Sequence, residues 1–153
     1  MDIYKHLKQV SIEIPELPKP VASYLPAIVF ENQIYVSGQT GTLDQKLVYQ
    51  GKLGAEVSVL DGKASARLAA LNCLAALQAV LGDLNRVERI LRVTGYVASA
   101  EGFNQQPAVI EGASALLIEV FGEKGWHARS AIGVAELPSS APIEIELIAA
   151  LAK

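Results

Sequence analysis

Three charged side chains stand in apolar segments near the C-terminus, where charges are uncommon. Arg129 opens one apolar run, and Glu144 and Glu146 alternate with the apolar residues between positions 143 and 147. Successive side chains of a strand point to opposite faces, so the two glutamates share one face and the apolar residues share the other. A guanidinium can bind an acidic ligand, and a carboxylate can move a proton. Either the glutamates form a polar, solvent-facing surface, or another subunit partly covers that face and Arg129 and a glutamate line a cleft.

The other reactive residue types argue against a metal site or a nucleotide site. His6 and His127 lie far apart and form no paired ligand spacing. The single cysteine, Cys73, can form neither an internal disulfide nor a cysteine-based metal cluster, and its apolar helical surroundings predict a small buried residue. Residues 37–41, Ser-Gly-Gln-Thr-Gly, lack the lysine and the following helix of a nucleotide-binding loop. The sequence therefore predicts no metal site.

The composition is more apolar than the length requires. The 153 residues are 51% hydrophobic without counting glycine, only 19% are charged, and the formal net charge is −3. An average soluble domain reaches about 45–50% apolar residues with glycine included. The length predicts one domain over residues 1–153, with residues 1–20 as an N-terminal arm. The apolar surplus indicates a membrane segment, an alanine-rich core or a buried subunit interface.

A membrane segment is the weakest of these three explanations. A spanning helix needs about 20 consecutive apolar residues, whereas Asn72 and Gln78 interrupt the best stretch, residues 68–81. The first residues lack the apolar core of a signal peptide, which predicts a cytoplasmic protein. The 13 basic residues are outnumbered by 16 acidic ones, which argues against a nucleic-acid partner.

Apolar periodicity and turn residues predict an α+β fold. A short helix is expected at 2–8 and an extended, proline-rich segment at 14–20. Asp61 and Gly82 are expected to cap the longest helix, and Gly112 in the second helix marks either a weak point or a close backbone contact. The order β-β-β-α-β-α-β-β indicates one sheet with both helices packed on one face. The expected strands are 27–30, 33–37, 46–50, 88–98, 127–136 and 143–151, and the expected helices are 61–82 and 107–121.

Four short motifs occur in one order along the chain: Ser37-Gly38-Gln39, His127-Ala128-Arg129-Ser130, Leu137-Pro138 and Ile143-Glu144-Ile145-Glu146. Together they resemble the RidA/YjgF family of reactive-intermediate imine deaminases, also known as endoribonuclease L-PSP-like proteins. The resemblance extends over residues 20–152 and indicates a longer, less characterised branch of the family.

The resemblance implies a chorismate-mutase-like fold and a homotrimer with ligand clefts between subunits. It implies hydrolysis of 2-imino or enamino acids to a 2-keto acid and ammonia, without a metal or organic cofactor. By the same resemblance, Arg129 grips the substrate carboxylate and Glu144 orients the hydrolytic water. Ser37 and Gly38 line the cleft, Tyr24 closes over it, and Ala131 offers its backbone amide.

Three departures from the family pattern leave other readings open. Ala131 stands where cysteine is usual, Ser114 falls near a usual asparagine, and His127 replaces a common proline. The alternative function is a non-catalytic trimer that binds a small carboxylate or has a regulatory role, and a ribonuclease is the third candidate. Glu146 could be the active glutamate in place of Glu144, and Arg129 could form a structural ion pair with either of them.

Strand arithmetic limits how Arg129 and Glu144 can meet. If their strands formed a direct hairpin about Ser139, Arg129 would face Ala149, and Glu144 would lie about 16 Å away at 3.3 Å per residue. Either the two strands are not direct partners, or the site is shared between chains. We take the shared site as the hypothesis.

Overall fold

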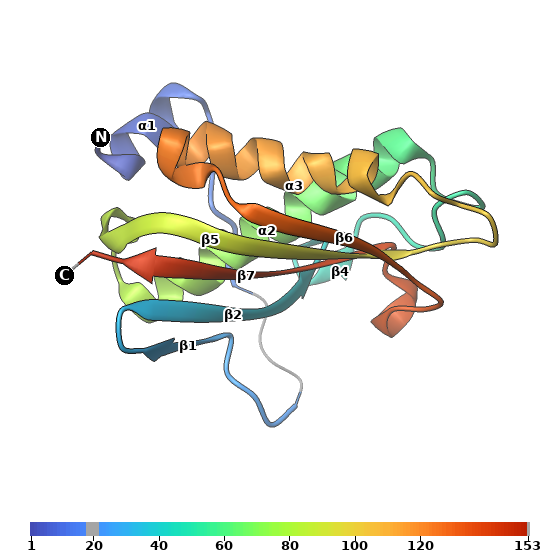
Figure 1. Cartoon of the computed structure of the whole chain (residues 1–153), viewed down its shortest axis with the longest axis horizontal. Coiled ribbons are helices and arrows are strands. Elements are labelled where there is room, and N and C mark those ends of the chain that lie inside the picture. The colour runs from blue at the N-terminus through green and yellow to red at the C-terminus, as the bar shows by residue number, and fades with distance from the viewer. Residues whose placement is uncertain (18–21, 153) are drawn as a thin grey trace.

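Five strands form one twisted sheet in the order β1-β2-β7-β5-β6 (Figure 1). The computed structural model describes residues 1–17 and 22–152. All neighbouring strands are antiparallel except β5 and β6, which are parallel and joined by a helical crossover. The strands are β1 (Ala27–Phe30), β2 (Gln33–Thr40), β5 (Val87–Ala98), β6 (Ala128–Val134) and β7 (Ile143–Leu151).

The expected hairpin at residues 27–37 is confirmed, but the expected third strand is not part of the main sheet. β2 continues to Thr40, with a register shift between Val36 and Gln39. The expected strand 46–50 is reduced to β4 (Lys46–Leu47), which pairs with β3 (Thr42–Leu43) in a separate two-stranded ribbon. The turn residues Asp44 and Gln45 both have positive φ angles, which folds this short ribbon back on itself.

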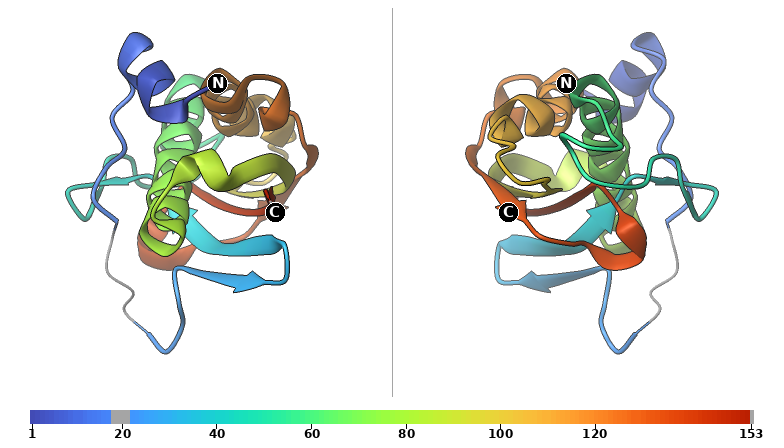
Figure 2. Two further views of the ribbon diagram at one scale, coloured as in Figure 1. Left: turned by 90° about the vertical axis from the view of Figure 1, so that its left-hand side faces the viewer. Right: turned by 90° about the vertical axis from the view of Figure 1, so that its right-hand side faces the viewer.

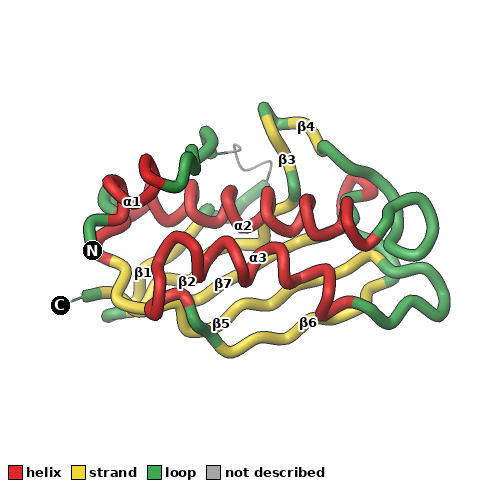
Figure 3. Tube along the Cα trace, turned by 90° about the horizontal axis from the view of Figure 1, so that it is seen from above, coloured by secondary structure: helices red, strands yellow, loops and turns green. Residues whose placement is uncertain are grey.

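Two helices, α2 (Val59–Leu81) and α3 (Gln106–Phe121), pack side by side on one face of the sheet, as expected (Figures 2 and 3). α2 covers β2 and β7, and α3 lies over β5 and β6. The cap expected at Asp61 is wrong: Ser58 is the N-cap, and its hydroxyl accepts from the Asp61 amide at 3.1 Å. Gly82, in the left-handed conformation, ends α2 as expected.

By length and composition alone, α2 could cross a membrane, with a mean hydropathy of 1.4 in its most apolar window. In this fold 61% of that 18-residue stretch is buried against the rest of the chain, so α2 is part of the core. Its small residues allow this close packing, since Ala66, Ala69, Ala70 and Ala76 are all fully buried. Part of the apolar surplus therefore lies in an alanine-rich core.

Gly112 marks a close backbone contact rather than a weak point. A Cβ at this position would collide with the main-chain carbonyl of Lys63 in α2. Likewise, a Cβ at Gly95 of β5 would collide with Ile110 of α3. These two glycines set how closely α3 approaches its neighbours.

The alternation expected in the last strand is confirmed. Ile143, Ile145 and Leu147 of β7 are buried under the helices, and Glu144 and Glu146 lie on the opposite face and are only partly buried. We call that opposite side, which the helices of this chain do not cover, the outer face of the sheet. Ile28, Phe30, Tyr35 and Ile132 are exposed on it.

The N-terminal residues pack across one end of the helical layer. The expected short helix is α1 (Ile3–Gln9), with Asp2 as its N-cap. The amide of Ile3 donates to Asn85 Oδ1 at 2.9 Å, and the Tyr4 hydroxyl accepts from the Leu84 amide at 3.1 Å. Residues 14–17 are neither helix nor strand, and the rest of the expected extended segment, residues 18–20, lies outside the described residues.

Candidate functional site

Four of the predicted site residues line one cavity at the end of β2. Tyr24, Ser37, Gly38 and Glu144 surround an open space of about 580 Å³, together with Gln39, Thr40, Thr42 and Pro138. The Ser37 hydroxyl donates to the carbonyl of Leu25 at 2.6 Å, and this bond ties the segment that carries Tyr24 to β2. We call this cavity the glutamate half.

Gly38 is required beneath the Glu144 carboxylate. Glu144 pairs with Thr40 in the register of β2 and β7, and a Cβ on Gly38 would collide with its carboxyl group. Burial raises the pKa of Glu144, and the nearby Glu146 carboxylate raises it further. A raised pKa makes the carboxylate a stronger base, which is better able to take a proton from water or a substrate.

The second glutamate of β7 has a different environment. Tyr96 of β5 donates its hydroxyl to Glu146 Oε1 at 2.9 Å, and this bond raises the pKa of Tyr96. Glu146 is absent from the lining of the glutamate half, which Glu144 contributes to. Behind β7, Cys73 is fully buried, and burial raises its thiol pKa strongly, so it is the inert small residue that the sequence predicts.

Arg129 lies on the helix-covered side of the sheet. It pairs in register with Val93, which is fully buried under the helices. Its Nη1 donates to Glu111 Oε2 at 3.0 Å and to Ser114 Oγ at 3.1 Å, both on α3. The ion pair expected as the structural alternative, with Glu144 or Glu146, is therefore wrong, because Arg129 pairs with Glu111.

Ala131 stands on the same side of the sheet as Arg129. It pairs with Gly95 of β5 and packs partly buried against the core. Arg129, Ala131 and Ser114 thus lie together at the β6 edge, beside a cavity of about 220 Å³ that is lined by Glu111, Ser114, Ile118, Trp126, His127 and Arg129. We call this second group the arginine half.

One chain does not bring the arginine half and the glutamate half together. β5 lies between β6 and β7, so their strands are not direct partners. Arg129 aligns with Val93 and through it with Leu147, three residues from Glu144. That is about 10 Å along the strands and about 10 Å across them, and the two side chains also point to opposite faces.

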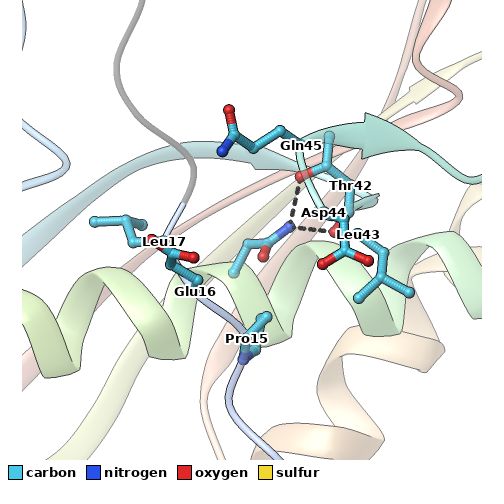
Figure 4. A pocket seen from close by; sticks show the side chains of 8 residues that line it. Pro15, Glu16, Leu17, Thr42, Leu43, Asp44 and Gln45 are labelled. Atoms are coloured by element: carbon cyan, nitrogen blue, oxygen red, sulfur yellow. Dashed lines mark hydrogen bonds between the residues drawn. The ribbon is translucent and has the colours of Figure 1, made fainter.

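Sequence reasoning missed Glu111, the acidic partner of Arg129. Its position in the sequence could have indicated it. Glu111 precedes the candidate Ser114 by three residues in the same predicted helix, and positions three apart on a helix are neighbours. A further cavity of about 230 Å³ lies elsewhere, where Pro15, Glu16 and Leu17 face the β3–β4 turn (Figure 4). None of the predicted site residues lines it. The described part of the chain holds no cluster of three histidine, cysteine or acidic side chains that could bind a metal ion.

Comparison with known proteins shows which family has this fold. A family model described as "YjgF/chorismate_mutase-like, putative endoribonuclease" matches residues 5–151. The chain belongs to the YjgF/RidA family. Its α+β fold, with a mixed sheet and helices, is the chorismate-mutase-like fold of that family.

Two curated proteins are similar to this YjgF/RidA chain, and the name of one of them states an activity. Protein TCP17 from Trypanosoma cruzi is 39% identical over 147 residues, which cover 95% of this chain and 92% of TCP17. A 2-iminobutanoate/2-iminopropanoate deaminase from Dermatophagoides farinae is 29% identical over 141 residues, with 90% and 92% covered.

The similar solved structures include a protein of unknown function, a protein called a "putative endoribonuclease" and a protein with a bound amino acid. The Agrobacterium tumefaciens protein Atu1372, of unknown function, has a TM-score of 0.91 and 38% identity, and the match covers 98% of this chain and 92% of that one. A Shewanella oneidensis protein called a "putative endoribonuclease" has a TM-score of 0.94 and 34% identity, with 99% and 100% covered. Escherichia coli TdcF with bound serine shares the fold at a TM-score of 0.65 and 20% identity, with 90% and 94% covered.

Proposed function

We propose that this YjgF/RidA chain hydrolyses reactive 2-imino and enamino acids to a 2-keto acid and ammonia. The observation that carries the proposal is the placement of Glu144, a carboxyl group with a raised pKa, in the cavity formed by Tyr24, Ser37 and Gly38. The family membership and the relative named 2-iminobutanoate/2-iminopropanoate deaminase support this reaction class.

In this proposal the site is completed by a second copy of the chain within a homotrimer. The arginine half and the glutamate half lie on opposite faces of one sheet, so neither can serve a small substrate alone. The exposed apolar residues of the outer face supply a surface that another subunit can bury. Arg129 of one protomer would then face the Glu144 cavity of its partner.

The arginine half is built to hold a carboxylate. The described side-chain hydrogen bonds of Arg129 all use Nη1, which leaves Nε and Nη2 to form two parallel bonds with a substrate carboxylate. TdcF, which has the same fold, binds serine, a small molecule with such a carboxylate. The backbone amide of Ala131 supplies a further donor on the same strand.

Glu144 supplies the proton transfers of the hydrolysis. The carboxylate takes a proton from water as the oxygen adds to C2 of the iminium, which gives a carbinolamine. The same proton then passes from Glu144 to the nitrogen. As the C–N bond breaks, Glu144 takes the hydroxyl proton and passes it to the departing ammonia, so the products are a 2-keto acid and ammonium. An enamino acid must first be protonated at C3 to give the iminium. General base catalysis of this kind contributes about 10²–10⁴-fold.

A coupled assay tests the proposal. Threonine dehydratase generates 2-iminobutanoate, and semicarbazide traps the imine that remains. We expect the wild-type protein to accelerate release of 2-oxobutanoate and Arg129→Ala to leave only the uncatalysed rate. Arg89→Ala, which removes an exposed arginine of β5, is the matched control. No acceleration by the wild-type protein would refute the enzymatic function.

A non-catalytic carboxylate-binding trimer is the second candidate. One observation favours it: Glu111 already forms an ion pair with one nitrogen of the Arg129 guanidinium, and its negative charge offsets the positive charge of the arginine half. Binding of 2-oxobutanoate that Arg129→Ala abolishes, without any acceleration of hydrolysis, would support this candidate. RNA cleavage that persists through purification would instead favour a ribonuclease, which the negative net charge argues against.

A further inference from the structure

A chain of three hydrogen bonds leads to Arg129 from the loop that precedes β6. His127 Nδ1 lies 2.6 Å from the carbonyl oxygen of Gly125, the last residue of the 3₁₀ turn η2 (Gly122–Gly125). His127 Nε2 lies 3.0 Å from Ser114 Oγ, and Ser114 Oγ lies 3.1 Å from Arg129 Nη1. His127, Ser114 and Arg129 all line the cavity of the arginine half.

The chemistry of the two ends fixes the direction of the two outer bonds in this chain, and the protonation state of His127 decides the middle one. The Gly125 carbonyl can only accept, so Nδ1 of His127 carries the proton. The Arg129 guanidinium can only donate, so Ser114 Oγ accepts from it. The hydroxyl proton of Ser114 is then free to be donated to the lone pair on His127 Nε2. This direction requires a neutral imidazole with its proton on Nδ1.

The surroundings of His127 favour that neutral ring. Burial lowers the pKa of His127, and the positive charge of Arg129 lowers it as well, although the Gly125 carbonyl and Glu111 act in the opposite sense. Since the net direction is downward, the ring is mostly neutral at pH 7. Arg129 and Glu111 are the charged groups that face it from β6 and α3.

We infer that His127 is a positioning residue that acts through the Ser114 hydroxyl to hold the Arg129 guanidinium in the orientation that receives a carboxylate. The inference rests on the proposed function, because it assigns Arg129 the substrate carboxylate. The Ser114–His127 pair fixes Nη1 from the side of α3, so Nε and Nη2 remain for the ligand. His127 itself need not touch the substrate.

Two substitutions of one residue separate this role from a structural one. His127→Gln places an amide oxygen near the position of Nε2, where it can accept from Ser114, but loses the bond to Gly125. His127→Asn places an amide nitrogen near the position of Nδ1, where it can donate to Gly125, but loses the bond to Ser114. If His127 only braces the loop, Asn will be the better replacement. If His127 positions Arg129, glutamine will be the better replacement.

Nitrogen NMR tests the hydrogen-bond chain without any ligand. Two-bond ¹H–¹⁵N spectra of the wild-type protein at pH 7 should show His127 protonated at Nδ1 and unprotonated at Nε2. The Arg129 Nε–H signal should be broadened or faster-exchanging in Ser114→Ala and His127→Asn, but wild-type-like in His127→Gln. A proton on Nε2, or an Arg129 signal that none of these variants changes, would overturn the inference.

Calorimetric titration with 2-oxobutanoate measures the consequence for binding. We expect Ser114→Ala and His127→Asn to weaken binding roughly tenfold, or by about 1.4 kcal/mol, because the guanidinium of Arg129 is then no longer held in one orientation. His127→Gln should bind like the wild type. Wild-type affinity in Ser114→Ala and His127→Asn would overturn the inference. If the wild-type protein binds no 2-oxobutanoate, the proposed function fails, and the NMR result alone decides the role of His127.

Discussion

At the scale of single residues, the two glutamates of β7 differ in the residues that surround their carboxyl groups. Glu146 accepts a hydrogen bond from Tyr96, whereas Glu144 lies over Gly38 in the cavity of the glutamate half. Burial raises the pKa of Glu144, and the negative charge of the neighbouring Glu146 raises it further. The contrast supports Glu144, rather than Glu146, as the proposed base.

Glu144→Gln is expected to lower activity and raise stability together. A carboxyl group whose pKa is raised in the folded state stabilises the fold below its unfolded pKa and loses that contribution as pH rises through the folded pKa. The neutral glutamine has no such loss. In the coupled assay the variant should fall to the uncatalysed rate. In thermal melts its Tm advantage over the wild type should grow as the pH rises above the ordinary carboxyl pKa and level off above the raised pKa of Glu144. A wild-type protein with the higher Tm at pH 8 would contradict this explanation.

The pH profile of the proposed reaction should depend on Glu146. Removing its charge with Glu146→Gln lowers the pKa of Glu144, so the acid limb of kcat/KM should move to lower pH. Tyr96→Phe is the control, because it removes the hydrogen bond to Glu146 but keeps the negative charge. An acid limb that stays in place in Glu146→Gln would show that another group controls the rate.

At the scale of elements, the packing of α2 against α3 fixes the arginine half. α3 supplies Glu111 and Ser114, and its distance from α2 is set at Gly112, where any side chain would meet the Lys63 carbonyl. On the other side of the sheet, the register shift in β2 places Ser37 and Gly38 beside Glu144. Each half of the site thus depends on one irregular or close-packed position.

Gly112→Ala should destabilise the fold even though alanine is the better helix former. The new methyl group would strike backbone that cannot rotate away, and overpacking of this kind costs about 1–3 kcal/mol or more, beyond the gain of about 1 kcal/mol in helix propensity. Gly62→Ala in α2 is the matched control, because its methyl group would meet the side chains of Leu53 and Val109, which can shift. Urea unfolding should show the larger loss at Gly112, and equal losses would contradict the backbone contact.

At the scale of the whole molecule, the outer face explains the remaining apolar surplus. Ile28, Phe30 and Tyr35 are exposed on a sheet face that none of the helices among residues 1–17 and 22–152 covers. Exposed apolar patches of this kind mark interaction surfaces, and the proposed homotrimer would bury them. The same assembly would complete the site, so stability and activity should both depend on it.

Mixing two inactive variants should restore activity if the site is shared. Arg129→Ala and Glu144→Gln chains, refolded together at equal amounts, can form sites with Arg129 from one chain and Glu144 from the other. About a quarter of all sites would then be intact, because each half is correct with a chance of about one in two. The coupled assay should recover activity only in the mixture. A mixture as inactive as its parts, or a monomer that stays fully active on dilution, would refute the shared site.

Local patterns in the sequence determined much of the fold. The hairpin at residues 27–37, the alternation in β7 and the end of α2 at Gly82 depend on neighbours in the chain, and each agrees with the structure. The predicted strand 46–50 failed because the tight turn at Asp44 and Gln45 pairs β4 with β3 instead of the sheet. The predicted N-cap at Asp61 lies three residues too late, because Ser58 caps the helix about one turn earlier.

The sequence determined the family and predicted the residue types of the candidate site, because short motifs carry both. Only the tertiary structure decided that Arg129 and Glu144 lie on opposite faces, that β5 separates their strands, and that Glu111 and His127 belong to the arginine half. These relations depend on strand order and register across the sheet, where a shift of one residue reverses the face of every side chain. Spacing along the chain does not specify that register.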